Sequence, residues 1–220
     1  MNQLYGVPLS PYCRKVQLAF AYREIPYELV ATPPGGSGAD FLLASPLRKI
    51  PAIKTEQGHQ FADSSVIIAY FEKASNDKPL YPTDLGDFAK ALFLEELADT
   101  KLSEAASALY FQLILSPTIY GKPADEKRVE QLKQELIPAQ LALLETLLPE
   151  SGWLVSNSYS VADVSVGAHL INLWHTDFKI DTNLYPRVAT FFDAFMQRED
   201  VKKHLQTEQQ ALQHFGNAGK

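Results

Sequence analysis

A change of pattern around residues 77–86 is the feature of this sequence that most limits its fold. Before this segment, short apolar stretches with strand composition alternate with stretches of helical periodicity. The segment itself contains Pro79 and Pro82 and few core-type residues, so we predict a linker. After it, apolar residues recur at helical spacing in five stretches, near residues 87–116, 124–148, 161–176, 186–197 and 199–213. The pattern therefore predicts two domains: an α/β domain over residues 1–76 and an all-helical domain over residues 87–220.

The predicted α/β domain has a recognisable order of elements. Strands are expected over residues 3–7, 27–30, 51–54 and 59–62. Helices are expected after residue 10, around residues 40–44 and after residue 63. The order βαβαββα resembles a thioredoxin-like domain, in which a four-stranded mixed sheet carries helices on both faces.

One proline does not fit the helical pattern of the second domain. Pro117, Pro123, Pro149 and Pro186 fall at or beyond predicted helix ends, where proline is tolerated. Pro138 falls inside a long helical stretch. Because proline has no N–H and its ring collides with the preceding turn, we expect a kink or a break at this position.

Composition excludes several classes of protein. The 220 residues carry a formal net charge of −6, which argues against nucleic acid or an anionic membrane surface as the main partner. No apolar run approaches the ~20 residues that a membrane span needs, and the N-terminus has no signal-peptide pattern. A single cysteine rules out an intramolecular disulfide and a cysteine-based metal cluster, and the five histidines lack metal-ligand spacing. We therefore expect a cytoplasmic protein without a metal or a membrane anchor.

The junction between the first strand and the first helix carries the sequence Ser10-Pro11-Tyr12-Cys13. Glutaredoxin-like proteins have Cys-Pro-Tyr-Cys at this junction, and the helix N-terminus stabilises the thiolate of the first cysteine. A serine hydroxyl can instead donate a hydrogen bond to a thiolate that another molecule brings, and glutathione is the natural candidate. Ser10 is also a favoured helix N-cap, so the tetrapeptide alone leaves a structural role open.

The domain order and four local motifs together resemble the cytosolic glutathione S-transferase superfamily over nearly the whole chain. The motifs lie at residues 10–16, 48–53, 63–67 and 160–163. The first resembles the serine-type active site of bacterial-type members, which implies that Ser10 activates glutathione. Tyr5 lies near the position used by tyrosine-type classes and is a secondary candidate. Cys13 would then be a second-row residue.

The second motif, residues 48–53, resembles the family segment Gly-Lys-Val-Pro-Ala-Leu. The resemblance implies a cis peptide bond before Pro51 and backbone pairing between Ile50 and the cysteinyl part of glutathione. Lys49 would face the glycine carboxylate. Arg48 replaces the usual small residue, and either a second cation for that carboxylate or a solvent-facing side chain fits the sequence.

The third and fourth motifs both begin predicted helices. By resemblance, Ser64 would bind the γ-glutamyl carboxylate at a helix N-terminus, and Asp63 would bind the γ-glutamyl ammonium. An ordinary Ser/Asp cap is the alternative. Ser160 and Asp163 have the spacing of a capping box, so we assign them a structural role. Replacing Asp163 by alanine should cost about 1 kcal/mol or more.

The resemblance implies a glutathione S-transferase that uses glutathione as co-substrate against a small apolar electrophile. It further implies a role in detoxification and a homodimer. Three alternatives remain open. A non-catalytic ligand carrier or scaffold would bind hydrophobic molecules without activating the thiol. A glutathione-dependent isomerase would use the same glutathione site, and a thiol reductase would need Cys13 as nucleophile.

Overall fold

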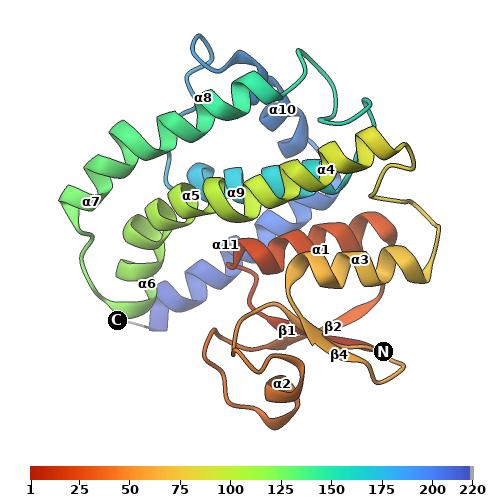
Figure 1. Ribbon diagram of the computed structural model, residues 1–220. Coiled ribbons are helices and arrows are strands. Elements are labelled where there is room, and N and C mark those ends of the chain that lie inside the picture. Colours follow the sequence, from red (N-terminus) through yellow and green to blue (C-terminus); the bar gives the residue numbers. More distant parts are fainter. Residues whose placement is uncertain (219–220) are drawn as a thin grey trace. The chain divides into compact units, whose positions relative to one another are not determined.

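The computed structural model describes residues 1–218, with side-chain detail through residue 214. The chain forms two compact units, the first spanning Met1–Leu80 and the second beginning at Tyr81 (Figure 1). Helix α4 begins at Leu85, so the last residues of the predicted linker form its first turn.

The first unit has the predicted element order. Its elements are β1 (Asn2–Gly6), α1 (Pro11–Arg23), β2 (Tyr27–Ala31), α2 (Ala39–Ala44), β3 (Ala52–Lys54), β4 (Gln60–Ala62) and α3 (Ser64–Ala74). The strands form one sheet in the order β2-β1-β3-β4. The β1–β2 pair is parallel, and the other two pairs are antiparallel. The predicted thioredoxin-like domain with a four-stranded mixed sheet is confirmed.

Alternating strand residues cover the two faces of this sheet. Tyr5 and Ala52 are cross-strand partners, and both pack with Phe41 of α2 in one buried cluster. The neighbouring pair, Leu4 and Ile53, is fully buried and points to the opposite face, because successive side chains alternate. Figure 1 shows α1 and α3 along one side of the sheet and α2 on the other. Because α1 and α3 pack against the same buried face of the sheet, that face fixes the positions of their N-termini.

The second unit is helical throughout. Its α-helices are α4 (Leu85–Leu97), α5 (Ser103–Tyr110), α6 (Ser116–Tyr120), α7 (Glu126–Gln131), α8 (Ile137–Leu147), α9 (Val161–His175), α10 (Pro186–Met196) and α11 (Glu199–Ala218). Helix α9 is the centre of this unit, since every residue over 161–173 is buried and α4, α5 and α10 pack around it. The predicted all-helical second domain is confirmed.

Three π-helical turns join some of these helices end to end. They span Ala98–Leu102, Phe111–Leu115 and Leu132–Leu136. Two of them stand directly before a helix that has proline in its first turn, Pro117 in α6 and Pro138 in α8. A π-turn widens the backbone, which accommodates a residue that has no N–H and collides with the preceding turn. The helical run thus passes through Pro138 without a break, and the expectation that Pro117 marks a helix end was wrong.

Among the described residues, no helix combines the length and the apolar character that crossing a membrane requires.

Candidate functional site

Ser10 lies at the β1–α1 junction and is the N-cap of α1. Its Oγ accepts a hydrogen bond from the backbone N–H of Cys13 at 3.4 Å, and its own N–H donates to the carbonyl of Val7 at 3.2 Å. A 3.4 Å bond is long for a cap, so the bond constrains the side chain weakly. The Oγ acts as acceptor in this bond, and a hydroxyl can still rotate its hydrogen toward another acceptor. The half-buried Ser10 hydroxyl can therefore donate to a sulfur at the helix start.

Cys13 is buried in the protein interior, in the first turn of α1. Its side chain has 0% exposure, and burial raises the pKa of the thiol to about 11, although hydrogen bonds to Ser10 and Val7 act to lower it. A Cβ atom at Gly6 would lie 2.4 Å from the Cys13 Sγ, so the close approach of β1 to α1 requires glycine at that position. A buried thiol with a raised pKa is a poor nucleophile at neutral pH. This geometry disfavours a thiol-reductase reaction through Cys13.

Tyr5 faces the other side of the sheet. Its ring is buried against Phe41 with centroids 6.0 Å apart, and its hydroxyl lies 3.5 Å from the side-chain oxygen of Gln3. Burial, together with the nearby Asp40, raises the pKa of the Tyr5 phenol. Tyr5 is a core residue between the sheet and α2, which leaves Ser10 as the better candidate.

The backbone before the predicted cis proline is held by one buried serine. Ser45 Oγ donates to the carbonyl of Lys49 at 2.7 Å and accepts from the Lys49 N–H at 3.0 Å. Arg48 has φ +56°, and its carbonyl accepts from the Gly35 N–H at 2.9 Å. The Ile50–Pro51 peptide bond is cis, as the resemblance implies. The side chains of Arg48 and Lys49 are exposed, so both are accessible to an anion.

Ile50 has backbone groups that suit pairing with a peptide. Among the described residues, no backbone group forms a hydrogen bond with its N–H or C=O. Extended segments commonly recruit a peptide through such unpaired main-chain groups. Ile50 thus presents one donor and one acceptor beside the end of β1.

The start of α3 contains both predicted γ-glutamyl contacts. Asp63 is the N-cap with φ +88°, and its Oδ1 accepts from the N–H groups of Ser65 at 2.9 Å and Val66 at 3.3 Å. Ser64 is the first helical residue and is 2% exposed. Asp63 therefore does serve as a cap, through one carboxylate oxygen, while its side chain stays exposed. Helix N-termini of this kind bind anions.

A chain of contacts brings these elements to one edge of the sheet. The Ile50 Cβ lies 4.0 Å from the Cβ position of Gly6, which also touches Cys13 of α1. The Pro51 carbonyl accepts from the Asp63 N–H at 3.3 Å, which joins the cis-proline segment to α3. Lys15 of α1 then reaches the first turn of α3. The helix starts of α1 and α3 and the Ile50 backbone are thus neighbours, although they are distant in sequence.

Two residues in this arrangement, Ser45 and Lys15, were not predicted from the sequence. Ser45 follows the short helix α2, and its hydroxyl forms hydrogen bonds with both the N–H and the carbonyl of Lys49. Lys15 is fully buried, with its Nζ 2.8 Å from Ser65 Oγ. Charged side chains are usually solvated, so only the tertiary structure shows that Lys15 is buried.

The fourth motif is buried at the start of α9. Asp163 has 0% exposure and accepts three hydrogen bonds, each 2.8 Å long, from the N–H of Leu154, the N–H of Ser160 and the hydroxyl of Ser160. Burial raises the pKa of its carboxyl to about 6, although these hydrogen bonds act to lower it. The predicted bond from the Ser160 backbone to Asp163 is confirmed, and the motif is part of the core.

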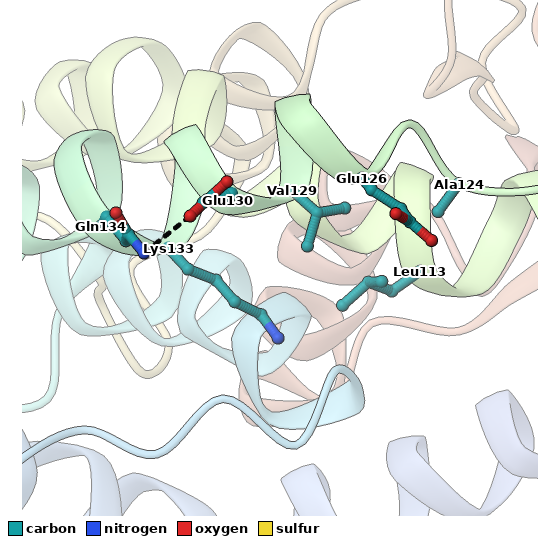
Figure 2. Close-up of a pocket in the computed structure, with 7 residues that line it drawn as sticks. All are labelled: Leu113, Ala124, Glu126, Val129, Glu130, Lys133 and Gln134. Carbon is teal, nitrogen blue, oxygen red and sulfur yellow. Dashed lines mark hydrogen bonds between the residues drawn. The ribbon is translucent and has the colours of Figure 1, made fainter.

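A separate surface cavity of about 480 Å³ lies in the second unit (Figure 2). It is lined by Leu113, Ala124, Glu126, Val129, Glu130, Lys133 and Gln134. Glu130 and Gln134 form a hydrogen bond of 3.2 Å along its rim. None of the predicted site residues lines this cavity. Within the described residues, no group of three or more His, Cys, Asp or Glu side chains is placed to hold a metal ion.

Two family models match the chain, one for each unit. Residues 4–79 match the glutathione S-transferase N-terminal domain, and residues 111–208 match the glutathione S-transferase C-terminal domain. The chain belongs to the glutathione S-transferase superfamily. The matched order of domains is the order that the change of pattern at residues 77–86 predicts.

Individual relatives of this transferase-family chain are distant. It is 26% identical over 205 residues to a probable glutathione S-transferase, GSTF2, of Oryza sativa, which covers 91% of this chain and 94% of that protein. It is similar to a glutathione S-transferase structure from Methylobacillus flagellatus with glutathione bound, with TM-score 0.75, 26% identity and coverage of 93% and 98%. It is also 27% identical over 202 residues to elongation factor 1-gamma 2 of Oryza sativa; this match covers 90% of this chain but only 46% of the elongation factor.

Proposed function

We propose that the protein is a glutathione S-transferase in which the Ser10 hydroxyl donates a hydrogen bond to the glutathione sulfur. The observation that carries this proposal is the position of that hydroxyl, half-buried at the N-cap of the 13-residue helix α1 and weakly engaged at 3.4 Å. The positive end of the helix adds to the stabilisation of a thiolate. Lowering a thiol pKa by ~2 units requires about 2.7 kcal/mol, which two or three oriented donors can supply.

Residues at the same edge of the sheet would make the remaining contacts with glutathione. Ile50, which precedes Pro51, would pair its free N–H and C=O with the cysteinyl residue of glutathione. The exposed Lys49, with Arg48 next to it, would attract the glycine carboxylate. The start of α3 would hold the α-amino acid end, with Ser64 facing the carboxylate and Asp63 facing the ammonium. Glutathione is bound in the related structure from Methylobacillus flagellatus, which supports this assignment.

The chemistry is nucleophilic substitution or addition by sulfur. The thiol loses its proton to solvent, and the thiolate sulfur forms a bond to an electrophilic carbon. In a substitution the leaving group departs with its electron pair, and in an addition the π bond of the electrophile breaks and its electron pair takes up a proton from solvent. Glutathione is thus a co-substrate, and the second substrate is a small apolar electrophile. We expect the protein to act in the cytoplasm as a homodimer with a role in detoxification.

A direct test combines binding and turnover. Glutathione binding is measured by titration calorimetry, and turnover is measured with an activated aryl halide. We expect Ser10→Ala to retain glutathione binding while turnover falls by about 100- to 1,000-fold, the range for loss of one donor that stabilises a developing negative charge. Ser37→Ala, a change in an exposed loop of the same unit, is the control and should leave both unchanged.

A non-catalytic carrier or scaffold is the second candidate. The similarity to elongation factor 1-gamma 2, over 90% of this chain, favours it, because that protein is named for elongation and not for glutathione transfer. A carrier would bind apolar ligands and leave the thiol pKa of glutathione at its free value. Failure of the wild-type protein to bind glutathione at millimolar concentration would favour this role. If Ser10→Ala turned over substrate at the wild-type rate, the protein would still be a transferase, but Ser10 would not be its catalytic residue.

A further inference from the structure

Four hydrogen bonds hold the turn that precedes Ile50. The Oγ of the buried Ser45 donates to the carbonyl of Lys49 at 2.7 Å and accepts from the Lys49 N–H at 3.0 Å. The Ser45 carbonyl accepts from the Arg48 N–H, and the Arg48 carbonyl accepts from the Gly35 N–H, each at 2.9 Å. Ile50 has no hydrogen bond to its own N–H or C=O from any residue that the structure describes. The hydrogen-bonded backbone therefore ends one residue before the unpaired one.

The two bonds of the Ser45 side chain act on different peptide planes. The Lys49 N–H shares a plane with the Arg48 carbonyl, which Gly35 also holds. The Lys49 carbonyl shares a plane with the Ile50 N–H, and among the described residues only the Ser45 hydroxyl forms a hydrogen bond to that plane. In a trans peptide group the C=O and the N–H point in opposite directions, so a bond that fixes one also fixes the other. The Ser45 hydroxyl therefore sets the direction of the Ile50 N–H.

A backbone conformation that is unfavourable for arginine lies within this turn. Arg48 has φ +56°, in the left-handed region that residues with a Cβ seldom occupy. Such a conformation persists only where neighbouring contacts fix it, and it is found most often beside ligand sites. The hydrogen bonds from Ser45 and Gly35 supply those contacts. The turn thus costs stability at Arg48 while it holds the peptide between Lys49 and Ile50 in one direction.

We propose that Ser45 is a positioning residue for glutathione and acts through the Ile50 N–H. The Ser45 hydroxyl fixes the Lys49 carbonyl, and the shared peptide plane then directs the Ile50 N–H toward the cysteinyl carbonyl of glutathione. A donor that is already held in its binding direction loses less conformational freedom on binding, so the fixed plane raises affinity. This inference rests on the proposed function, since it requires glutathione to pair with Ile50.

The test uses two truncated peptides that differ in one group. γ-Glutamyl-cysteinamide keeps the carbonyl that the Ile50 N–H would bind, and γ-glutamyl-cysteamine lacks the whole carboxamide. Neither peptide contains the glycine carboxylate, so Lys49 does not distinguish them. Titration calorimetry gives both dissociation constants, and the cysteamine constant divided by the cysteinamide constant measures the pairing with Ile50. We expect Ser45→Ala to reduce this ratio about fivefold, the contribution of one hydrogen bond, and to weaken glutathione binding by a similar factor.

Thr55→Ala is the matched control in the same unit. The Thr55 hydroxyl is also buried and also bonds to the backbone four residues further on, where it accepts from the His59 N–H at 3.1 Å. This change should lower the melting temperature and leave the ratio unchanged. Ser45→Cys keeps the shape of the side chain but has a weaker donor. It serves as the second variant if Ser45→Ala does not fold, and should reduce the ratio about threefold.

The possible results separate this inference from the proposed function. An unchanged ratio in a folded Ser45→Ala or Ser45→Cys protein would show a merely structural role, overturn the inference and leave the proposed function standing. If wild type bound glutathione but bound the two truncated peptides equally, Ile50 would not pair with the cysteinyl carbonyl, and the inference would fall while the role of Ser10 stood. A wild-type protein that binds none of the three peptides would overturn the proposed function, and this inference with it.

Discussion

Helices α1 and α9 both begin with a serine N-cap, yet the two serines have different surroundings. Ser160 is 2% exposed, and its hydroxyl donates to the buried carboxylate of Asp163 at 2.8 Å. Ser10 is half-buried; its Oγ accepts a long bond of 3.4 Å from the Cys13 N–H, and its hydroxyl also contacts the Cys13 thiol. The hydroxyl hydrogen of Ser160 is therefore committed to the core, whereas that of Ser10 can turn toward a ligand. The same residue type at the same helix position stabilises the fold in one unit and suits chemistry in the other.

The largest effect on this comparison is expected from Asp163→Ala. The change leaves the N–H groups of Leu154 and Ser160 buried without their acceptor, so we expect the free energy of unfolding to fall by about 3 kcal/mol or more. Urea denaturation measures the loss, with Asp193→Ala on the exposed side of α10 as the control. A loss below about 1 kcal/mol would contradict the structural role of the motif.

The pH dependence of stability sharpens the same point. The folded-state pKa of Asp163, about 6, exceeds the ordinary value of 3.8, so the folded protein holds this proton more tightly than the unfolded chain. The stability from this group is complete below about pH 4 and is lost as the pH rises through 6, by up to about 3 kcal/mol. We therefore expect wild type to lose stability relative to Asp163→Asn as the pH rises through this interval. Unfolding measurements on both proteins at each pH give the difference in their free energies of unfolding. A difference that is flat from pH 4 to 7 would contradict a raised pKa.

Direct substitution of the two serines gives a smaller contrast. Ser160→Ala removes a buried hydrogen bond and should cost about 1–2 kcal/mol. Ser10→Ala removes a long bond at a half-exposed position and should cost less than about 1 kcal/mol. Both are measured by urea denaturation of the same preparation. Equal costs would mean that Ser10 is as structural as Ser160.

The smallest functional effect is expected for Cys13→Ala. Because the thiol is buried and its pKa is raised to about 11, it contributes no nucleophile, and turnover should stay within about twofold of wild type. Native wild-type protein should also react slowly with a thiol reagent, and quickly once denatured. Loss of turnover in a folded Cys13→Ala protein would return the thiol-reductase reaction to consideration.

Local sequence patterns predicted most of the fold. Alternating and helical periodicity predicted the βαβαββα order, and the proline-containing segment separated it from the helical residues that follow. The passage of helices through Pro117 and Pro138 was not predicted, because a π-turn depends on how the whole helical run packs. Helix-propensity scales include the energetic cost of proline inside a helix, but they do not include a preceding π-turn that accommodates the proline.

The candidate site was predicted in part. Motif spacing located Ser10, Ile50 and Ser64, each at the beginning or end of an element where ligands usually bind. Lys15 and Ser45 were missed because their roles depend on contacts with other segments, 50 and 4 residues away in sequence. A lysine that follows an arginine in a helix has no local signal of burial, since charge alone predicts a solvated position.

A pH titration of bound glutathione, followed by the ultraviolet absorbance of the thiolate, tests the central claim most directly. We expect wild type and Ser160→Ala to lower the thiol pKa of glutathione below its free value of ~8.5. In Ser10→Ala the pKa should return toward that value, because the hydroxyl donor is lost. A lowered pKa that survives in Ser10→Ala would contradict the account and assign thiolate stabilisation to the helix start or to another donor.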